Sequence, residues 1–425
     1  MSKIATLRGM NDLTPEEVRV WNIAEEIIKR VFTSYGYEEI RFPIVEKTEL
    51  FTRSNESADI VTKEMYTFED KGGDSISLRP EGTAGCVRAA IDNDLIRIDS
   101  PRLWYQGPMF RYERPQKGRS RQFYQSSAEV FGIRSPEIDA ELIILCSRIW
   151  KELGIEKNLS LEINNLGDEK TRKSYAKSLQ DYFKNYEEEL DPDLRKKINE
   201  NPLRVLDSKS DSIKNLLNDA PKISDFISEN SQSDFNDLIF LLKEAGIKFS
   251  INQKLVRGLD YYNQTVYEWK TNQLGAQDTV CGGGRYDNLV EELGGKPCSA
   301  TGFSIGMERL ILLMKETAEL NLDNKSVNLF FVCLTKESVQ KAIMYSESLR
   351  EKVSNLGIKI NMGLEGAGSQ FKKADKSGAS LALILGDDEL KSDTISIKDL
   401  RSNSDQEAIS YDDLVKRIKK IYKKG

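Results

Sequence analysis

From residue 327 onward the sequence alternates short apolar runs with longer amphipathic stretches, and this pattern limits the possible folds more than any other feature. Strand-like runs occur at 327–334, 359–365, 381–390 and 393–400, and helix-like stretches occur at 337–357, 369–379 and 411–424. Strands that alternate with helices predict an α/β domain in which helices cover a sheet. The polar stretch 320–326 precedes this region, so we predict a separate α/β domain at 327–425.

The region before residue 322 begins with a helix signal. Thr14 and Glu17 have the spacing of a capping box, and Pro15 stands at the first helical position. An amphipathic helix is therefore expected from here to about residue 34. The following stretch, 38–51, reads as a strand, but Pro43 cannot donate a backbone hydrogen bond within a sheet. We expect this strand to lie at a sheet edge or an interface.

The remainder of residues 1–322 mixes strands and helices, with strands dominant. A hairpin is predicted around Gly72 and Gly73. Further strands are expected at 102–113, 121–132, 158–167, 249–271, 279–290 and at the start of 302–316, and a helix is expected at 137–154. Residues 168–230 are lysine-rich and polar, which indicates an inserted helical subdomain. The fold class is mixed α/β (α+β), with two main domains.

The composition excludes several kinds of chemistry. The chain has 62 Lys and Arg against 68 Asp and Glu, so any polyanion must bind to a local basic patch. It contains no histidine, so its chemistry uses no imidazole from the protein. The cysteines form no C-x-x-C pair, which gives no reason to expect zinc or a redox couple, and we assign no metal ligand. No apolar run reaches the roughly 20 residues of a membrane helix, and we expect a cytoplasmic protein.

Residues 110–125, "FRYERPQKGRSRQFYQ", concentrate positive charge between two predicted strands. Arg111 at the end of the first strand could clamp a phosphate, because a guanidinium donates two parallel hydrogen bonds. The loop residues Arg114, Gln116 and Arg121 could grip a nucleic-acid backbone and contact a base edge. A solvated basic hairpin is the alternative, and charge alone favours it.

Four other segments carry residues suited to ligand binding. "SLRPEGTAG" presents Glu81 and Thr83, a carboxylate and a hydroxyl that could bind an amine. "LVRGLDYYNQTVYEW" contains Arg257, and "VCGGGRYDNLV" has consecutive glycines that permit a ligand to approach the backbone closely. "GFSIGMERL" places Arg309 at the start of a helix. Each segment alone is weak, since an isolated glycine run or arginine is more often structural.

Taken together, these segments resemble the histidyl-tRNA synthetases, bacterial in type, of the class II aminoacyl-tRNA synthetases. The helix and strand ending at Pro43, the basic hairpin and "GFSIGMERL" match the class motifs. "LVRGLDYYNQTVYEW" and "GGGRYDNLV" are specific to the histidine branch, and "NPLRVLDSK" also matches it. The resemblance implies a class II catalytic domain at 1–322, built on an antiparallel sheet with an insertion at 168–230, and an anticodon-binding domain at 327–425.

The resemblance also implies an activity, its cofactors and its partners. The enzyme would activate histidine with ATP and Mg²⁺, transfer it to the 3′ end of the histidine tRNA, and act as a homodimer. The resemblance assigns Arg111 and Arg257 to catalysis, and it assigns Arg111, Glu113 and Arg309 to the binding of ATP. The implied histidine-binding residues are Glu81, Thr83, Gln125, Glu129, Arg257, Tyr261 and Tyr262. For Tyr261, packing in an aromatic core is the explanation we favour, whereas for Tyr262 we favour the site. Arg114, Gln116 and Arg121 would contact the tRNA acceptor end.

Two positions depart from the family pattern, and other functions stay open. Tyr124 stands where the family usually has histidine, and Ser127 stands where it usually has glycine. The family also includes a non-charging regulatory subunit of histidine biosynthesis, which typically lacks the anticodon-binding domain. A protein that only binds RNA is a third possibility, although it leaves the pocket residues unexplained. The lack of histidine would let the enzyme be made when charged histidine tRNA is scarce, and compositional drift explains it equally well.

Overall fold

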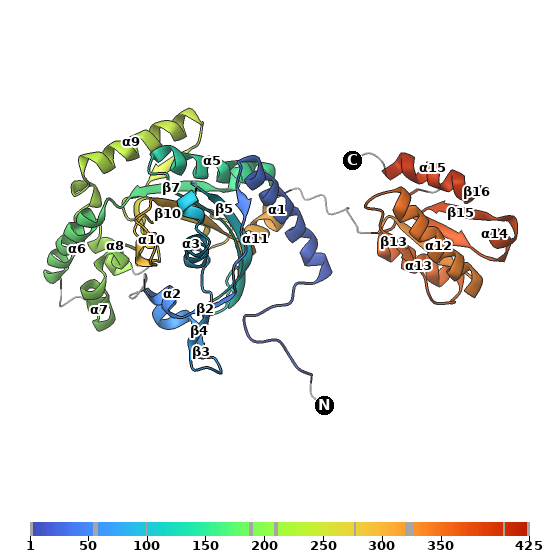
Figure 1. Ribbon diagram of the computed structural model, residues 1–425, viewed down its shortest axis with the longest axis horizontal. Coiled ribbons are helices and arrows are strands. Elements are labelled where there is room, and N and C mark those ends of the chain that lie inside the picture. The colour runs from blue at the N-terminus through green and yellow to red at the C-terminus, as the bar shows by residue number, and fades with distance from the viewer. Residues whose placement is uncertain are drawn as a thin grey trace. The chain divides into compact units, whose positions relative to one another are not determined.

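The computed structural model describes residues 3–53, 58–98, 100–186, 190–207, 211–275, 278–318, 327–402 and 404–422. The chain divides into two compact units, Met1–Leu320 and Asn321–Gly425 (Figure 1). The predicted polar boundary, 320–326, lies outside the described residues. Within the described ranges, no helix is both long and apolar enough to cross a membrane.

An eight-stranded sheet organises the first unit. Its strands lie in the order β1 (Glu38–Glu39), β5 (Arg102–Phe110), β6 (Gln122–Phe131), β11 (Ala300–Gly306), β10 (Thr279–Arg285), β9 (Asn263–Lys270), β7 (Ser160–Asn165) and β8 (Phe249–Ile251). All pairs from β5 to β7 are antiparallel, and the pairs at the two edges are parallel. The predicted sheet dominated by antiparallel strands is confirmed.

The two faces of this sheet differ because successive side chains of a strand point to opposite sides. One face carries apolar residues such as Tyr267, Trp269, Phe303 and Ile305, which are buried in the largest hydrophobic core. Helices α1 (Pro15–Ser34), α5 (Pro136–Glu152) and α11 (Met307–Thr317) supply the other half of that core. The opposite face carries charged, hydroxyl and glycine residues, so it is the face available for a binding site.

Helix α1 begins as predicted. The Thr14 hydroxyl accepts a hydrogen bond from the Glu17 amide, and the Glu17 carboxylate accepts one from the Thr14 amide at 2.9 Å. Pro15 occupies the first turn, where its missing amide hydrogen costs nothing. Trp21 and Ile28 on the buried stripe then anchor the helix on the sheet.

Smaller elements surround the polar face of the large sheet. A second sheet has the order β2 (Val45–Lys47), β4 (Ser75–Leu78), β3 (Tyr66–Glu69). Short helices are α2 (Glu49–Thr52), α3 (Thr83–Asp92), α4 (Leu95–Ile98) and α10 (Leu289–Glu292), and a π-helical turn spans Ile60–Glu64. The region predicted as an insertion contains α6 (Glu169–Lys184), α7 (Pro192–Glu200) and α8 (Asp211–Leu216), and α9 (Glu229–Glu244) follows it. Figure 1 shows α6, α7 and α8 at the end of this unit away from α1.

Several predictions about strands need correction. The stretch 249–271 is two strands, β8 and β9, and the predicted strands 102–113 and 359–365 end earlier, at Phe110 and Ile360. The stretch 38–51 is not one strand: Pro43 lies between β1 and β2, which belong to different sheets. A proline cannot complete either ladder, so the chain changes sheet there. Arg111 was expected on a strand but lies one residue beyond the end of β5. Within the run 381–390, the strand ends at Leu385. Gly386 caps the helix that follows, α14 (Asp387–Ser392), and its amide donates a hydrogen bond to the Glu389 carboxylate.

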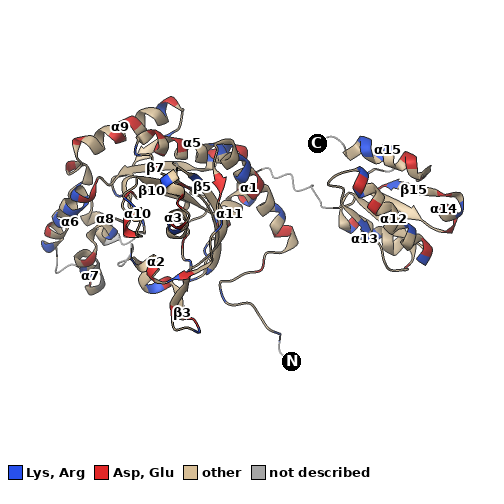
Figure 2. Ribbon diagram, in the orientation of Figure 1, with Lys and Arg blue, Asp and Glu red and all other residues tan. Residues whose placement is uncertain are grey.

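The second unit has a five-stranded sheet in the order β13 (Ile358–Ile360), β12 (Leu329–Cys333), β14 (Leu381–Leu385), β15 (Thr394–Asp399), β16 (Glu407–Ser410). Its helices are α12 (Lys336–Lys352), α13 (Ala367–Ser377), α14 (Asp387–Ser392) and α15 (Tyr411–Tyr422). The predicted α/β alternation is confirmed, although β16 and α14 were not foreseen. Figure 2 shows acidic residues at the start of α15 and basic residues towards its end, which suits the helix dipole.

A buried ion pair fixes α5 to the sheet of the first unit. The Arg285 guanidinium on β10 donates to the Asp139 carboxylate on α5 at 2.7 Å, and both side chains are almost fully buried. Arg285 also donates to the Ser135 carbonyl at 2.6 Å, and the Thr301 hydroxyl donates to Asp139 at 2.8 Å. Burial raises the pKa of Asp139, and the charge of Arg285 opposes that rise. The pair therefore stabilises the unit only while both partners are present.

Asp139→Asn should destabilise the first unit by about 3 kcal/mol, because it leaves a buried guanidinium without its main counter-charge. Urea unfolding followed by tryptophan fluorescence measures this, since all 4 tryptophans lie in that unit. Asp287→Asn is the control: Asp287 lies 3.6 Å from Arg285 but is more exposed. Equal losses in the two variants would show that the buried pair has no special role.

Candidate active site

The polar face of the sheet brings together residues that are far apart in the sequence. Glu129 on β6 pairs in register with Gly302 on β11, and Gln125 pairs with Gly306. On the next strands, Gly282 of β10 pairs with Glu268 of β9. Residues that pair directly point to the same side of a sheet, so all these positions share one surface.

The carboxyl group of Glu129 is the most deeply buried acidic group on this surface. It accepts hydrogen bonds from the Thr83 hydroxyl and the Tyr105 hydroxyl, each at 2.9 Å, and from the Tyr286 hydroxyl. Only 1% of the residue is exposed, and burial raises its pKa to about 8. A β-carbon at position 302 would lie 1.8 Å from this carboxylate, so only glycine fits opposite it.

Glu81 and Thr83 adjoin Glu129 at the start of helix α3. The Glu81 carboxylate accepts hydrogen bonds from the amides of Thr83 at 2.6 Å and Ala84 at 3.0 Å. It thereby satisfies two amides of the first helical turn, while burial raises its pKa. The two hydrogen bonds to Glu81 thus hold the start of α3, and the Thr83 hydroxyl connects the start of this helix to the Glu129 carboxylate.

Tyr261 and Tyr262 complete the wall around this cluster. Their ring centroids lie 4.7 Å apart, and the Tyr286 ring lies 5.7 Å from Tyr261. Tyr261 is 3% and Tyr262 is 8% exposed, so both are buried beside the acidic pocket. The structure brings Glu81, Thr83 and Glu129 close to both tyrosines, which belong to one hydrophobic cluster.

The inserted helical region holds the loop that carries these tyrosines. Arg172 on α6 donates to the Tyr262 carbonyl at 2.8 Å and to the Asp260 carbonyl at 3.2 Å. Asn201 and Arg204 donate to the Asp260 carboxylate at 2.9 and 2.8 Å. The segment "NPLRVLDSK" was noticed in the sequence without a role, and this contact supplies one.

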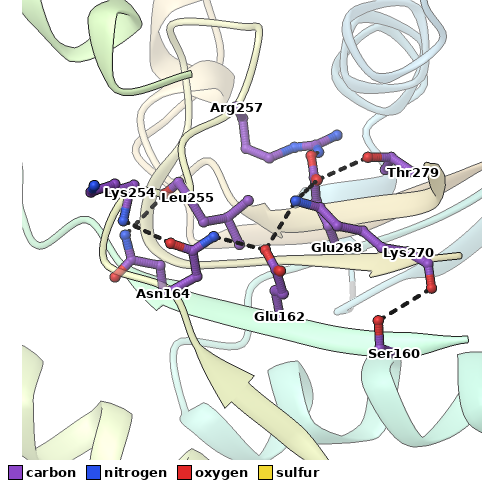
Figure 3. A network of polar contacts seen from close by, with 10 residues as sticks. Ser160, Glu162, Asn164, Lys254, Leu255, Arg257, Glu268, Lys270 and Thr279 are labelled. Atoms are coloured by element: carbon purple, nitrogen blue, oxygen red, sulfur yellow. Dashed lines mark hydrogen bonds and ion pairs between the residues drawn. The ribbon is translucent and has the colours of Figure 1, made fainter. Parts of the chain in front are cut away.

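Arg257 lies flat against β10 beside the pocket. Its guanidinium donates to the Glu268 carboxylate (Figure 3). The guanidinium also lies 5.6 Å from the Tyr262 ring centroid. Burial disfavours the charged guanidinium, but the Glu268 carboxylate outweighs burial and raises the pKa of Arg257. A β-carbon at position 282 would lie 2.5 Å from the guanidinium nitrogens. The absence of a side chain at Gly282 therefore makes room for Arg257.

A polar cavity of about 170 Å³ lies next to Arg257. Arg111, Arg309 and Glu113 line it, together with Gln125, whose side-chain oxygen is buried without a hydrogen-bond partner. Arg111 donates to the Pro80 carbonyl at 2.8 Å, and Arg309 donates to the Thr279 carbonyl at 2.6 Å. Several guanidinium groups thus converge on one cavity, an arrangement suited to a polyphosphate.

The basic loop between β5 and β6 folds back on itself. The backbones of Gln116 and Arg119 exchange two hydrogen bonds of 3.0 and 2.9 Å. Arg119 then pairs with the Glu113 carboxylate. Arg114 and Gln116 are exposed at the loop surface. Arg121 is separate from them: its guanidinium lies 3.7 Å from the Tyr112 ring centroid and donates to the Glu113 carbonyl.

The two positions that depart from the family pattern have structural partners. The Tyr124 ring packs edge-on against Trp21 of α1, with centroids 5.3 Å apart, and the Tyr124 amide donates to the Glu308 carboxylate. Burial raises the pKa of Glu308 to about 7. The Ser127 hydroxyl lies 2.7 Å from the Ser304 hydroxyl on the neighbouring strand. Neither substitution interrupts the Glu129 cluster.

Sequence reasoning missed several residues of this site. Tyr105, Tyr286, Glu268, Thr279 and Glu308 all contact the site or line its cavity. The sequence does carry a signal for Glu268, because it stands between Tyr267 and Trp269, which face the apolar core, and so Glu268 faces the opposite side of the strand. Tyr105 and Tyr286 could not be found without the strand register.

The donor set fits a magnesium ion that arrives with a nucleotide. Among the residues that the structure describes, no group of three acidic, cysteine or histidine side chains could hold a metal by itself. Mg²⁺ bound to phosphates needs only one or two carboxylates and keeps several waters. Glu113 and Glu308 are the carboxylates of the cavity and would be its protein contacts.

The sheet order, with arginines at the end of β5 and the start of α11, defines the fold of a class II aminoacyl-tRNA synthetase. The family model for histidyl-tRNA synthetase matches residues 9–310, and the model for an anticodon binding domain matches residues 329–421. The chain therefore belongs to the histidyl-tRNA synthetase family.

Solved structures agree with this assignment. The apo histidyl-tRNA synthetase of S. aureus has 34% identity and a TM-score of 0.82, over 98% of this chain and 100% of that one. The histidyl-tRNA synthetase from Nostoc sp. PCC 7120 has 25% identity and a TM-score of 0.69, over 99% and 100%. A Bacillus halodurans protein described as an ATP phosphoribosyltransferase regulatory subunit/histidyl-tRNA synthetase shares the fold, with 19% identity and a TM-score of 0.64, over 88% and 97%.

Glu129→Gln should change how stability depends on pH. In the folded protein the pKa of Glu129 is about 8, against 4.5 for an exposed glutamate. Between these values the folded state binds a proton that the unfolded state has released, so stability falls as pH rises. Glutamine removes this loss. The variant should gain stability relative to wild type between about pH 5 and about pH 8.5, measured by urea midpoints. A pH-independent difference would contradict the raised pKa.

Proposed function

We propose that this chain is a histidine–tRNA ligase. It activates histidine with ATP to form histidyl-adenylate and pyrophosphate, and then transfers histidine to the 3′ end of its tRNA. The observation that carries the proposal is the adjacency of two sites on one sheet face. One is a buried carboxylate ringed by hydroxyl groups, and the other is an arginine-lined cavity beside it.

Activation needs no general base, which suits a chain without histidine. The carboxylate oxygen of the substrate attacks the α-phosphorus of ATP, the bond from that phosphorus to the β-bridging oxygen breaks, and pyrophosphate leaves with the electron pair. The barrier lies in charge at the five-coordinate phosphorus. Arg111 and Arg257 would hold the α-phosphate from two sides, and Arg309 and Glu113 would position the other phosphates and the bound metal. Mg²⁺ would neutralise part of the phosphate charge.

Selectivity for histidine would come from hydrogen bonds to the imidazole. Glu129 and Tyr262 would contact the ring nitrogens, while Glu81, Thr83 and Gln125 would bind the α-amino and carboxylate groups. Tyr261 would shape the pocket through packing. An amino acid without ring nitrogens would leave the buried Glu129 carboxylate with one partner fewer, which disfavours binding.

The tRNA would bind to both units of the chain. Arg114 and Gln116 are exposed on the basic loop and would contact the acceptor end. Arg121 is held by Tyr112 and the Glu113 carbonyl, so we assign it to the support of the loop as well as to a phosphate contact. The second unit would bind the anticodon. We also propose that the enzyme is a cytoplasmic homodimer whose interface includes α1 and β1.

Arg257→Ala should reduce histidine-dependent exchange of pyrophosphate into ATP by about 10²- to 10³-fold in kcat, because a preorganised charge at the α-phosphate is lost. Arg148→Ala, which removes an exposed arginine of α5, is the control and should leave exchange unchanged. Folded wild-type protein that binds histidine but supports no exchange would reject the ligase and favour the regulatory subunit.

Gly282→Ala should have a similar effect without removing any charged group. The new methyl group would occupy the space of the Arg257 guanidinium, so kcat of exchange should fall at least about tenfold while KM for histidine changes little. Gly258→Ala adds the same methyl group where no atom lies within 4 Å and should be neutral. Normal exchange in Gly282→Ala would show that Arg257 need not lie against β10.

A further inference from the structure

Two carboxylates face each other on the polar side of the sheet. Glu162 on β7 pairs in register with Glu268 on β9, so their side chains project from neighbouring strands to the same side. Like charges placed directly opposite destabilise a sheet. Both are partly buried, with side-chain exposures of 25% and 13%, which makes their repulsion stronger than in water.

Lys270 lies between these carboxylates. It stands two residues after Glu268 on β9, and therefore on the same face. Its ammonium nitrogen is 2.9 Å from a Glu162 oxygen and 3.4 Å from a Glu268 oxygen (Figure 3). Partial burial disfavours the charged ammonium, but the hydrogen bond to Glu162 and the charge of Glu268 outweigh it and raise the pKa of Lys270.

The two oxygens of Glu268 have different partners. One accepts from Arg257, and the other accepts from the Thr279 hydroxyl at 2.9 Å and faces Lys270. Glu162 is fixed in turn by a hydrogen bond of 2.8 Å from the side-chain amide of Asn252. A chain of alternating charge therefore runs across β7 and β9 from Glu162 through Lys270 and Glu268 to Arg257, and its net charge is zero.

We propose that Lys270 is a positioning residue for Arg257. The charge of Lys270 balances one of the two carboxylates, Glu162 and Glu268. Glu268 therefore holds the guanidinium of Arg257 in place through one oxygen, and the guanidinium stays free to meet developing charge on a phosphate. This inference rests on the proposed ligase function, in which Arg257 contacts the α-phosphate. Lys270 itself touches no substrate.

Loss of Lys270 alone should disturb Arg257. The pair of carboxylates would then have only one cation, and Arg257 would be drawn further towards them and away from the cavity. If Glu162 loses its charge as well, Glu268 and Arg257 again balance. The position of Arg257 is then restored although the lysine is absent.

Steady-state pyrophosphate exchange tests the proposal. Lys270→Met should lower kcat by about tenfold to hundredfold, since small displacements of a catalytic group are costly, with KM for ATP and histidine changed less than about threefold. The double variant Glu162→Gln/Lys270→Met should recover most of the kcat. Lys254→Met is the matched control: the Lys254 ammonium carries the same charge nearby but hydrogen-bonds Asn218, and the hydrogen bond that the Lys254 backbone amide donates to Asn252 is kept by the substitution. Its kcat should equal that of wild type.

Crystal structures of the same variants provide a readout that does not depend on activity. The guanidinium of Arg257 should leave its place against Gly282 in Lys270→Met and return in the double variant. An unmoved Arg257, or a double variant as slow as Lys270→Met, would overturn the proposal. Absence of exchange in wild type, with the predicted movements of Arg257 present, would reject the ligase function but support the positioning role.

Discussion

Strict alternation along antiparallel strands is the constraint on which the whole site depends. Register places Gln125 and Glu129 of β6, Gly282 of β10 and Glu268 of β9 on one surface, while Phe303 and Tyr267 point to the opposite one. A slip of one residue in any strand would exchange the two sets. The core on the apolar face therefore fixes the register, and the register fixes the site.

Buried charge on the polar face is stabilised by neighbours rather than by water. Glu129 relies on three hydroxyl groups, and Arg257 relies on Glu268. Such groups are held only when the surrounding backbone leaves space, which explains the glycines opposite both of them. The consecutive glycines of β10 thus serve the protein's own side chains as well as any ligand that approaches.

Much of the architecture could be predicted from the sequence. Periodicity and capping residues were sufficient for α1, for the strands around the basic loop and for the α/β pattern of the second unit, because those signals are local. Pro43 indicated that strand pairing is interrupted at this position, but it did not show that the chain passes from one sheet to another there. Strand β16 was missed because it has only four residues and is mostly exposed, so its sequence carries no apolar pattern. Arg111 was a candidate phosphate ligand from its place in the basic hairpin, and the resemblance supplied the roles of Arg257 and Glu129. Tyr105, Tyr286 and Lys270 required the register between strands distant in sequence.

The central claim is that this sheet face activates histidine for transfer to RNA. The most direct measurement is the formation of histidyl-tRNA by the purified chain, followed on acidic gels with histidine tRNA, ATP, Mg²⁺ and histidine. The account predicts charged tRNA that forms only when histidine and ATP are both present, and none when another amino acid replaces histidine. Protein that binds histidine and remains folded, yet leaves the tRNA uncharged, would contradict it.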